Sequence, residues 1–168
     1  MKRTLLFISL AIAYTACRAI STPYISINTD NTSIILHVSQ DDRLMFMHYG
    51  AHIGDVQQYV GYNSYRRTDY GTDPMAYPTR GGRYYNEPAL AVKYHDTDVN
   101  TELKYVSHST TQIQAGLERT EVILQDPKTL LEVRMVYVAY SKEDIIVAHT
   151  EISNKGKKDV ILDNYASS

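Results

Sequence analysis

Short segments in which apolar and polar residues alternate, separated by turn-forming residues, constrain the fold of this chain most strongly. The longest runs from Leu130 to Tyr140. Alternate residues of a strand point to the same side of a sheet, and one side of this segment is apolar throughout: Leu131, Val133, Met135, Tyr137 and Ala139. Before it, Asp126-Pro127-Lys128 is a strong turn signal, because proline presets the turn dihedral and the aspartate can bond the backbone ahead of it. The segment is therefore predicted to be a strand with one buried face.

The same pattern recurs along the chain, with turn signals about every 8 to 12 residues. Nine strands are predicted, over residues 24–28, 33–39, 44–49, 89–95, 103–113, 118–125, 130–140, 144–153 and 160–165. No segment presents a convincing helical face, and residues 50–73 show no sustained period, which indicates a long loop with at most one helical turn or short strand. The predicted fold is all-β, an antiparallel β-sandwich with long loops and little helix.

The stretch Met75–Val92 lies between strand-like segments but contains residues that break regular structure and several that are aromatic or charged. The first group is Pro78, Gly81, Gly82 and Pro88, and the second is Tyr77, Arg80, Arg83, Tyr84, Tyr85 and Glu87. Loops held on a rigid β scaffold are where binding residues concentrate, so this loop is the first candidate for a binding site. The alternative is an ordinary long connection whose tyrosines cover the edge of the core.

Length and composition fit one soluble domain. A chain of 168 residues can bury a real core, and 43% hydrophobic with 21% charged residues is typical of globular proteins and not of disordered or membrane-spanning ones. The 15 tyrosines stand against 2 phenylalanines and no tryptophan. Tyrosine suits both half-buried strand positions and sugar-facing surfaces, because its ring is apolar while its hydroxyl forms hydrogen bonds.

The first 19 residues have the pattern of a secretory signal peptide. Lys2 and Arg3 precede the apolar run Leu5–Ala13, and small residues follow around positions 16–19. The run is too short to span a bilayer as a helix, so we expect it to be removed, which leaves a domain over residues 20–168 that is secreted or periplasmic. Cys17, the single cysteine, is either removed with the signal or becomes a lipid-bearing first residue; in neither case can a disulfide form within the chain.

Charge and motifs exclude several classes of function. Removing residues 1–19 leaves 14 basic against 19 acidic residues, and an acidic chain without a basic stripe is a poor nucleic-acid binder. Phosphate loops, nucleophile elbows and CxxC pairs are absent from the sequence. His48 and His52 have a zinc spacing only if they share a helix face, which Gly50 argues against. No metal and no cofactor is therefore predicted.

Paired carboxylates are the remaining catalytic option. Glycoside cleavage needs two, one to protonate the leaving oxygen and one to attack or to activate water. Asp69, Asp73 and Glu87 are acids of the tyrosine-rich loops. The sequence does not fix their separation, and an acid on the rim of a sandwich is more often solvated than catalytic.

Five blocks, in order and at plausible spacing, resemble the N-terminal domain of glycoside hydrolase family 36 α-galactosidases, especially secreted bacterial ones. They are Tyr77-Pro-Thr-x-Gly, Asn86-Glu-Pro-Ala-Leu-Ala-Val92, Glu102-Leu-Lys-Tyr-Val-Ser-His108, Lys142-Glu-Asp-Ile145 and Asp163-Asn-Tyr-Ala-Ser-Ser168. The resemblance runs from about Ile25 to the last residue. It implies a β-supersandwich domain that, in complete members, precedes a catalytic (β/α)8 barrel and a small C-terminal β domain.

The resemblance also implies an activity and its division between domains. Family members are retaining exo-glycosidases that remove terminal α-linked galactose from melibiose, raffinose and related chains, and both catalytic aspartates belong to the barrel. This chain is expected to end before the barrel begins, so no catalytic residue is assigned to it and the fragment alone is expected to be inactive. Its α-galactoside would bind through the barrel, and the full-length protein would be a homo-oligomer.

The resemblance further implies that the loop Tyr77–Glu87 comes near the sugar pocket, in some oligomers that of a neighbouring subunit. Arg83, Tyr84 and Glu87 are the candidates for the substrate rim. The chain departs from the family at Arg80, where members often carry an aromatic residue. Two alternatives stay open: a stand-alone carbohydrate-binding module with Tyr77, Tyr84 and Tyr85 as its platform, and a surface lipoprotein anchored at Cys17.

Overall fold

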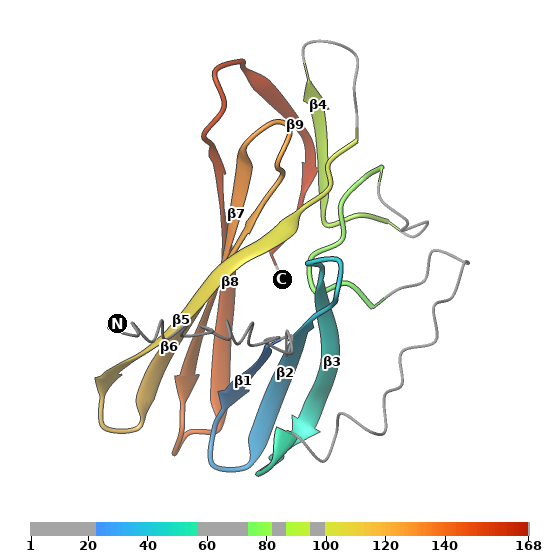
Figure 1. Ribbon diagram of the computed structural model, residues 1–168. Coiled ribbons are helices and arrows are strands. Elements are labelled where there is room, and N and C mark those ends of the chain that lie inside the picture. Colours follow the sequence, from blue (N-terminus) through green and yellow to red (C-terminus); the bar gives the residue numbers. More distant parts are fainter. Residues whose placement is uncertain (1–22, 57–73, 82–86, 95–99, 168) are drawn as a thin grey trace, which may run out of the picture.

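The computed structural model describes residues 23–56, 74–81, 87–94 and 100–167, and within them nine strands form the fold (Figure 1). The strands are β1 (Tyr24–Asn28), β2 (Thr32–Val38), β3 (Leu44–Ala51), β4 (Leu90–Tyr94), β5 (Lys104–Gln114), β6 (Leu117–Gln125), β7 (Leu131–Tyr140), β8 (Ile145–Asn154) and β9 (Val160–Tyr165). All strand pairings are antiparallel. The predicted all-β antiparallel sandwich is confirmed, with boundaries that move by one or two residues.

One layer of the sandwich is a four-stranded sheet in the order β5-β6-β7-β8. Its strands are joined by short hairpin turns, so neighbours in sequence are neighbours in space. The turn between β5 and β6 contains Gly116, whose φ of 75° is readily adopted by glycine. This meander follows directly from the turn signals in the sequence.

The second layer contains a three-stranded sheet, β1-β2-β3, and a two-stranded sheet, β4-β9. Segment 74–80 lies between these two sheets and bonds to both. The Ala76 amide donates to the Leu44 carbonyl of β3 (2.9 Å), and the Arg80 amide donates to the Leu90 carbonyl of β4 (2.9 Å). The start of the candidate loop therefore joins the two sheets of this layer.

The hydrophobic core lies between the layers, and its buried residues come mainly from β1, β2, β4, β6 and β7. On β7 the core side consists of the five apolar residues that alternation predicts, all of them buried: Leu131, Val133, Met135, Tyr137 and Ala139. Opposite them, the second layer contributes residues of β1 and β2, among them Ile25, Ile27, Leu36 and Val38. Burial of this apolar side is the main force that fixes the register of β7, because a slip of one residue would expose it.

β2 departs from simple alternation. The sequence places Ile34, Leu36 and Val38 on one side and Ser33, Ile35 and His37 on the other, which suggests one buried side. Ser33 and Ile35 are nevertheless fully buried, so both sides of the middle of β2 are covered. The strand is central in its sheet, so β1 and β3 also cover both of its edges.

The turn before β7 forms as its sequence predicts. One carboxylate oxygen of Asp126 accepts hydrogen bonds from the amides of Lys128 (2.8 Å) and Thr129 (3.1 Å). The other accepts one from the amide of Glu102 (2.8 Å), in the segment that leads into β5. Asp126 is only 1% exposed. The turn residue therefore also ties the β6–β7 turn to a distant part of the chain.

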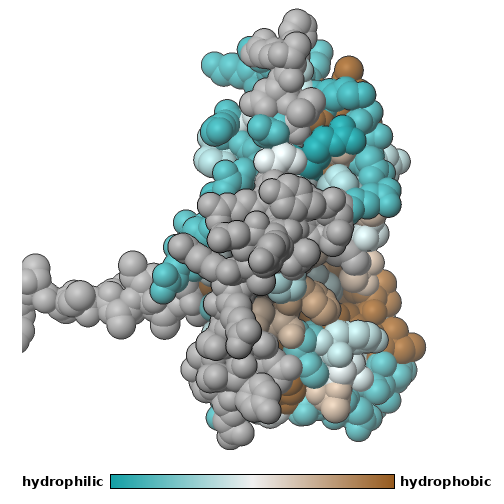
Figure 2. All heavy atoms as spheres, turned by 90° about the vertical axis from the view of Figure 1, so that its right-hand side faces the viewer, coloured by the Kyte–Doolittle hydropathy of each residue, from teal (hydrophilic) through white to brown (hydrophobic). Residues whose placement is uncertain are grey.

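Within the part of the chain that the structure describes, no helix is long and apolar enough to cross a membrane. Figure 2 views the side of the molecule on which β3 and β4 lie in Figure 1. Hydrophilic residues cover the upper part of this side, and hydrophobic residues gather lower down along one edge. The upper part of this side, where β4 lies in Figure 1, therefore presents a mainly polar surface.

Candidate functional site

Tyr77 is the first aromatic residue of the candidate loop, and it belongs to the core. Its side chain is 1% exposed and packs in the main hydrophobic cluster. Its hydroxyl donates a hydrogen bond to the carbonyl of Ala166 (2.9 Å), directly after β9. Burial raises the pKa of Tyr77 to about 12. Tyr77 is therefore not part of a sugar-binding platform, and that part of the binding-module hypothesis is wrong; Tyr84 and Tyr85 lie outside the described residues.

Arg80 is held by an ion pair with a residue far away in the sequence. Its guanidinium lies 2.8 Å from one carboxylate oxygen of Asp163 on β9, and the ammonium of Lys93 on β4 lies 2.7 Å from the other. Hydrogen bonds hold the pKa of Asp163 below its usual range; the one from Lys93 has the larger effect and the one from Arg80 the smaller. No local pattern predicts this partner, because Asp163 lies 83 positions after Arg80 in the sequence.

β9 also fixes the other end of the loop. The amide of Ala166 donates to the carbonyl of Ala89 (2.8 Å), and the side-chain amide of Asn164 donates to the carbonyl of Pro88 (3.2 Å). The first stem is held through Tyr77 and Arg80, which bond to Ala166 and Asp163. Strand β9 and the residue after it therefore hold both stems of the loop at defined positions. Fixed supports of this kind are what a binding site requires.

Of the three rim candidates, the structure describes only Glu87. Glu87 is exposed and directly precedes the fixed stem at Pro88. Arg83 and Tyr84 lie outside the described residues, as do the other two loop acids, Asp69 and Asp73. The structure therefore places one rim candidate on the surface beside a fixed stem, and a pairing of the loop acids lies outside the described residues.

Within the described part of the chain, the two histidines with a possible zinc spacing belong to no metal-binding cluster. The Nε2 atom of His48, on β3, lies 3.1 Å from the carbonyl oxygen of Ala51, and Nδ1 of His52 lies 3.5 Å from the hydroxyl of Ser33. Among the described residues, no group of three or more His, Cys, Asp or Glu side chains is placed to hold a metal ion.

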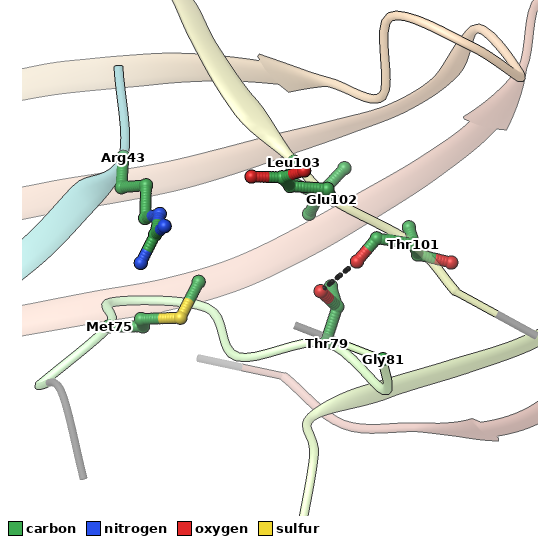
Figure 3. Close-up of a pocket in the computed structure, with 7 residues that line it drawn as sticks. All are labelled: Arg43, Met75, Thr79, Gly81, Thr101, Glu102 and Leu103. Carbon is green, nitrogen blue, oxygen red and sulfur yellow. Dashed lines mark hydrogen bonds between the residues drawn. The ribbon is translucent and has the colours of Figure 1, made fainter. Parts of the chain in front are cut away.

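A pocket of about 340 Å³ lies beside the first stem of the loop (Figure 3). Three distant segments line it, through Arg43, Met75, Thr79, Gly81, Thr101, Glu102 and Leu103. In Figure 3, the carboxylate of Glu102 points toward the side on which Arg43 lies, and Met75 lies below them. Arg43 and Glu102 are 59 positions apart in the sequence, and no local pattern predicted that they meet.

The wall of this pocket is fixed from within the domain. Thr79 and Thr101 are both buried, and the Thr79 hydroxyl donates to the Thr101 carbonyl (2.5 Å). Gly81 has a φ of 93°, and a Cβ atom there would lie 2.2 Å from the Asn100 side chain, so only glycine fits. The pocket is therefore preformed where these segments meet.

Solved structures share this fold. A variant of the α-galactosidase AgaA from Geobacillus stearothermophilus, in complex with raffinose, has a TM-score of 0.75 and 21% identity over 86% of this chain and 24% of that chain. The α-galactosidase from Lactobacillus brevis has a TM-score of 0.76 and 20% identity over 86% of this chain and 23% of that chain. AgaB from Geobacillus stearothermophilus has a TM-score of 0.70 and 19% identity over 88% and 24%. The chain spans about a quarter of the length of these structures, and at these identities the similarity establishes the fold alone.

The sequence comparisons give two results. No curated protein matches this chain. A family model, described as the glycosyl hydrolase family 36 N-terminal domain, matches residues 42–168, which is most of the chain and includes all five sequence blocks. The chain therefore belongs to the glycosyl hydrolase family 36 N-terminal domain family.

Proposed function

We propose that this chain serves as the non-catalytic N-terminal domain of an α-galactosidase that removes terminal α-linked galactose from oligosaccharides of the melibiose and raffinose type. The observation that carries the proposal is the family match over residues 42–168. It is supported by the shared fold with solved α-galactosidases, one of which holds raffinose. The chemistry in this proposal belongs to a (β/α)8 barrel outside these residues.

Within such an enzyme the domain supports the barrel, contributes contacts between subunits of a homo-oligomer, and borders the active site through the loop Tyr77–Glu87. The stems fixed by β9 support the last of these roles, because both ends of the loop are held at defined positions. Glu87 is exposed at the second stem and is available to a polar ligand. Arg83 and Tyr84 complete the proposed rim.

An assay with 4-nitrophenyl α-galactoside tests the division of labour. We expect no turnover by the purified chain above the buffer blank, with a whole family 36 α-galactosidase as the positive control. We also expect the coding sequence downstream of Ser168 to continue into the barrel. Turnover by the chain at about 1 s⁻¹ or faster, a rate ordinary for enzymes, would place the catalytic groups inside this domain and would contradict the proposal.

We further propose that residues 1–19 are a signal peptide and that the mature domain is secreted or periplasmic. The charged start, the apolar run and the small residues that follow support this. Mass spectrometry of the mature protein should find a first residue near position 20. A first residue at Cys17 carrying the mass of acyl chains would instead support the lipoprotein alternative, and a mature chain that begins at Met1 would contradict both.

A further inference from the structure

The pocket beside the loop stem has the size and rigidity of a small-molecule site. Its volume of about 340 Å³ lies at the lower end of the range for such sites, about 300–1,000 Å³. The backbone that lines it is bonded across sequence-distant segments: the Thr101 amide donates to the Arg80 carbonyl (3.0 Å), and the Glu102 amide donates to Asp126 (2.8 Å). A ligand would therefore bind without having to order this wall, which removes one of the costs of binding.

Arg43 and Glu102, the two charged residues that line the pocket, each form an ion pair with a neighbouring side chain. The Arg43 guanidinium lies 2.9 Å from the carboxylate of Asp41, and the Lys104 ammonium lies 2.9 Å from the carboxylate of Glu102. Lys104 also donates to the Asp41 carbonyl (2.9 Å), so the two pairs adjoin. These four side chains carry no net formal charge, and a site of this kind does not favour an anion or a cation as its ligand.

Glu102 gives the pocket its hydrogen-bonding capacity. Its side chain is 53% exposed and points into the space between the walls (Figure 3). An ionised carboxylate has about four acceptor positions, and the ion pair with Lys104 is made through Oε1. Hydroxyl groups are the donors that suit such an acceptor when the ligand is neutral, and a hydrogen bond to a charged acceptor is stronger than one between neutral groups.

Met75 and Leu103 add apolar surface to the same pocket. A sugar ring carries hydroxyl groups around its edge and C–H groups on its faces, so it can meet a carboxylate and an apolar side chain together. We propose that the pocket between Arg43 and Glu102 is a non-catalytic binding site for a neutral sugar of one or two rings. The proposal does not depend on the proposed enzymatic role, because all of its residues belong to this domain.

Titration of the purified full chain with galactose, melibiose and raffinose tests the proposal. Labelling the methionine methyl groups with ¹³C provides a reporter inside the pocket, since the Met75 signal can be assigned with a Met75→Leu variant. We expect a saturable shift of the Met75 signal, with a Kd on the order of 1 mM. Glycine and inorganic phosphate, as a zwitterion and an anion, should shift this signal less than the sugars at equal concentration.

Two variants locate the site. Glu102→Ala removes the proposed acceptor from an exposed side chain and should raise the sugar Kd at least about tenfold, as expected for the loss of a charged hydrogen bond. Lys104→Gln removes the ion pair but keeps the carboxylate, and should leave Kd within about threefold. Circular dichroism of both variants checks that they fold.

Three results would overturn the proposal: no saturable shift at Met75 with any of the sugars, an unchanged Kd in Glu102→Ala, or tighter binding of glycine or phosphate than of the sugars. None of these results bears on turnover by the complete enzyme. Conversely, catalysis by the isolated chain would contradict the proposed division of labour and would leave this site untouched. The two proposals therefore fail independently.

Discussion

Replacing Asp126 by Ala is expected to lower the free energy of unfolding by about 3–5 kcal/mol. The carboxylate is buried and accepts three hydrogen bonds from backbone amides, two within the turn before β7 and one from Glu102. Hydrogen bonds to charged groups contribute about 1.5–3 kcal/mol each, and their losses are not additive because they share one acceptor group. Urea denaturation followed by far-ultraviolet circular dichroism measures the change.

Two further variants test whether the loss of stability comes from the hydrogen bonds of the Asp126 carboxylate. Asp126→Asn keeps one carbonyl oxygen, which can serve the turn or the amide of Glu102 but not both, so we expect a smaller loss, about 1.5–3 kcal/mol. Asp159→Ala removes an exposed aspartate of another turn and should change the free energy of unfolding by less than about 0.5 kcal/mol. A loss below about 1 kcal/mol in Asp126→Ala would show that the carboxylate does not hold these segments together.

Replacing Tyr77 by Ala is expected to lower the free energy of unfolding by about 3–5 kcal/mol, as for other large aromatic side chains removed from a core. The ring is 1% exposed and lies in the main hydrophobic cluster. Tyr77→Phe keeps the ring and loses only the hydrogen bond to the Ala166 carbonyl, so a loss of about 0.5–1.5 kcal/mol is expected. Both values come from urea denaturation at neutral pH.

The control for Tyr77 is Tyr49, which is 68% exposed on β3. Tyr49→Ala removes an exposed side chain that is paired in register with Ile34 of β2, and it should lower the free energy of unfolding by no more than about 1 kcal/mol. If Tyr77→Ala were as mild as Tyr49→Ala, the first stem of the loop would not be part of the core. The loop would then be an ordinary surface connection, and its role as a fixed support for the rim residues would be lost.

The Tyr77 hydroxyl also predicts a dependence on alkaline pH. Its pKa in the folded state is about 12, against 10.0 for an unperturbed tyrosine. Because its pKa is raised in the folded state, the hydroxyl contributes fully to the free energy of unfolding below pH 10. This contribution is lost as pH rises toward 12, because the hydroxyl ionises at a lower pH in the unfolded chain than in the folded one. Wild type should lose about 1 kcal/mol more stability than Tyr77→Phe between pH 9 and pH 11. Equal losses in the two proteins would contradict burial of the hydroxyl.

Local patterns predicted the strands well because the physical cause of each strand is itself local. The alternation in Leu131–Tyr140 and the turn chemistry at Asp126 depend on neighbours in the sequence, and both are confirmed. The sequence blocks also pointed to the right family, because several in register are more specific than any one of them.

The candidate loop shows where sequence reasoning fails. Its proline and glycine residues indicated a loop, yet segment 74–80 bonds to both β3 and β4 and joins two sheets. Tyrosine is a residue type that often faces sugars, but Tyr77 is a core residue. Nothing local distinguishes a tyrosine that covers a ligand from one that fills the interior, since both roles use an apolar ring with a bonded hydroxyl.

By itself, the sequence determined the all-β class, the positions of the strands and the tight turns between them, because these depend on alternation and on dihedral preferences within a few residues. The tertiary structure alone decided which distant groups meet. It placed Asp163 against Arg80 and the backbone amide of Glu102 within hydrogen-bond distance of the second carboxylate oxygen of Asp126. It also formed the pocket that Arg43 and Glu102 line. Such contacts depend on how two layers of sheet pack over a shared core, and no spacing along the chain encodes them.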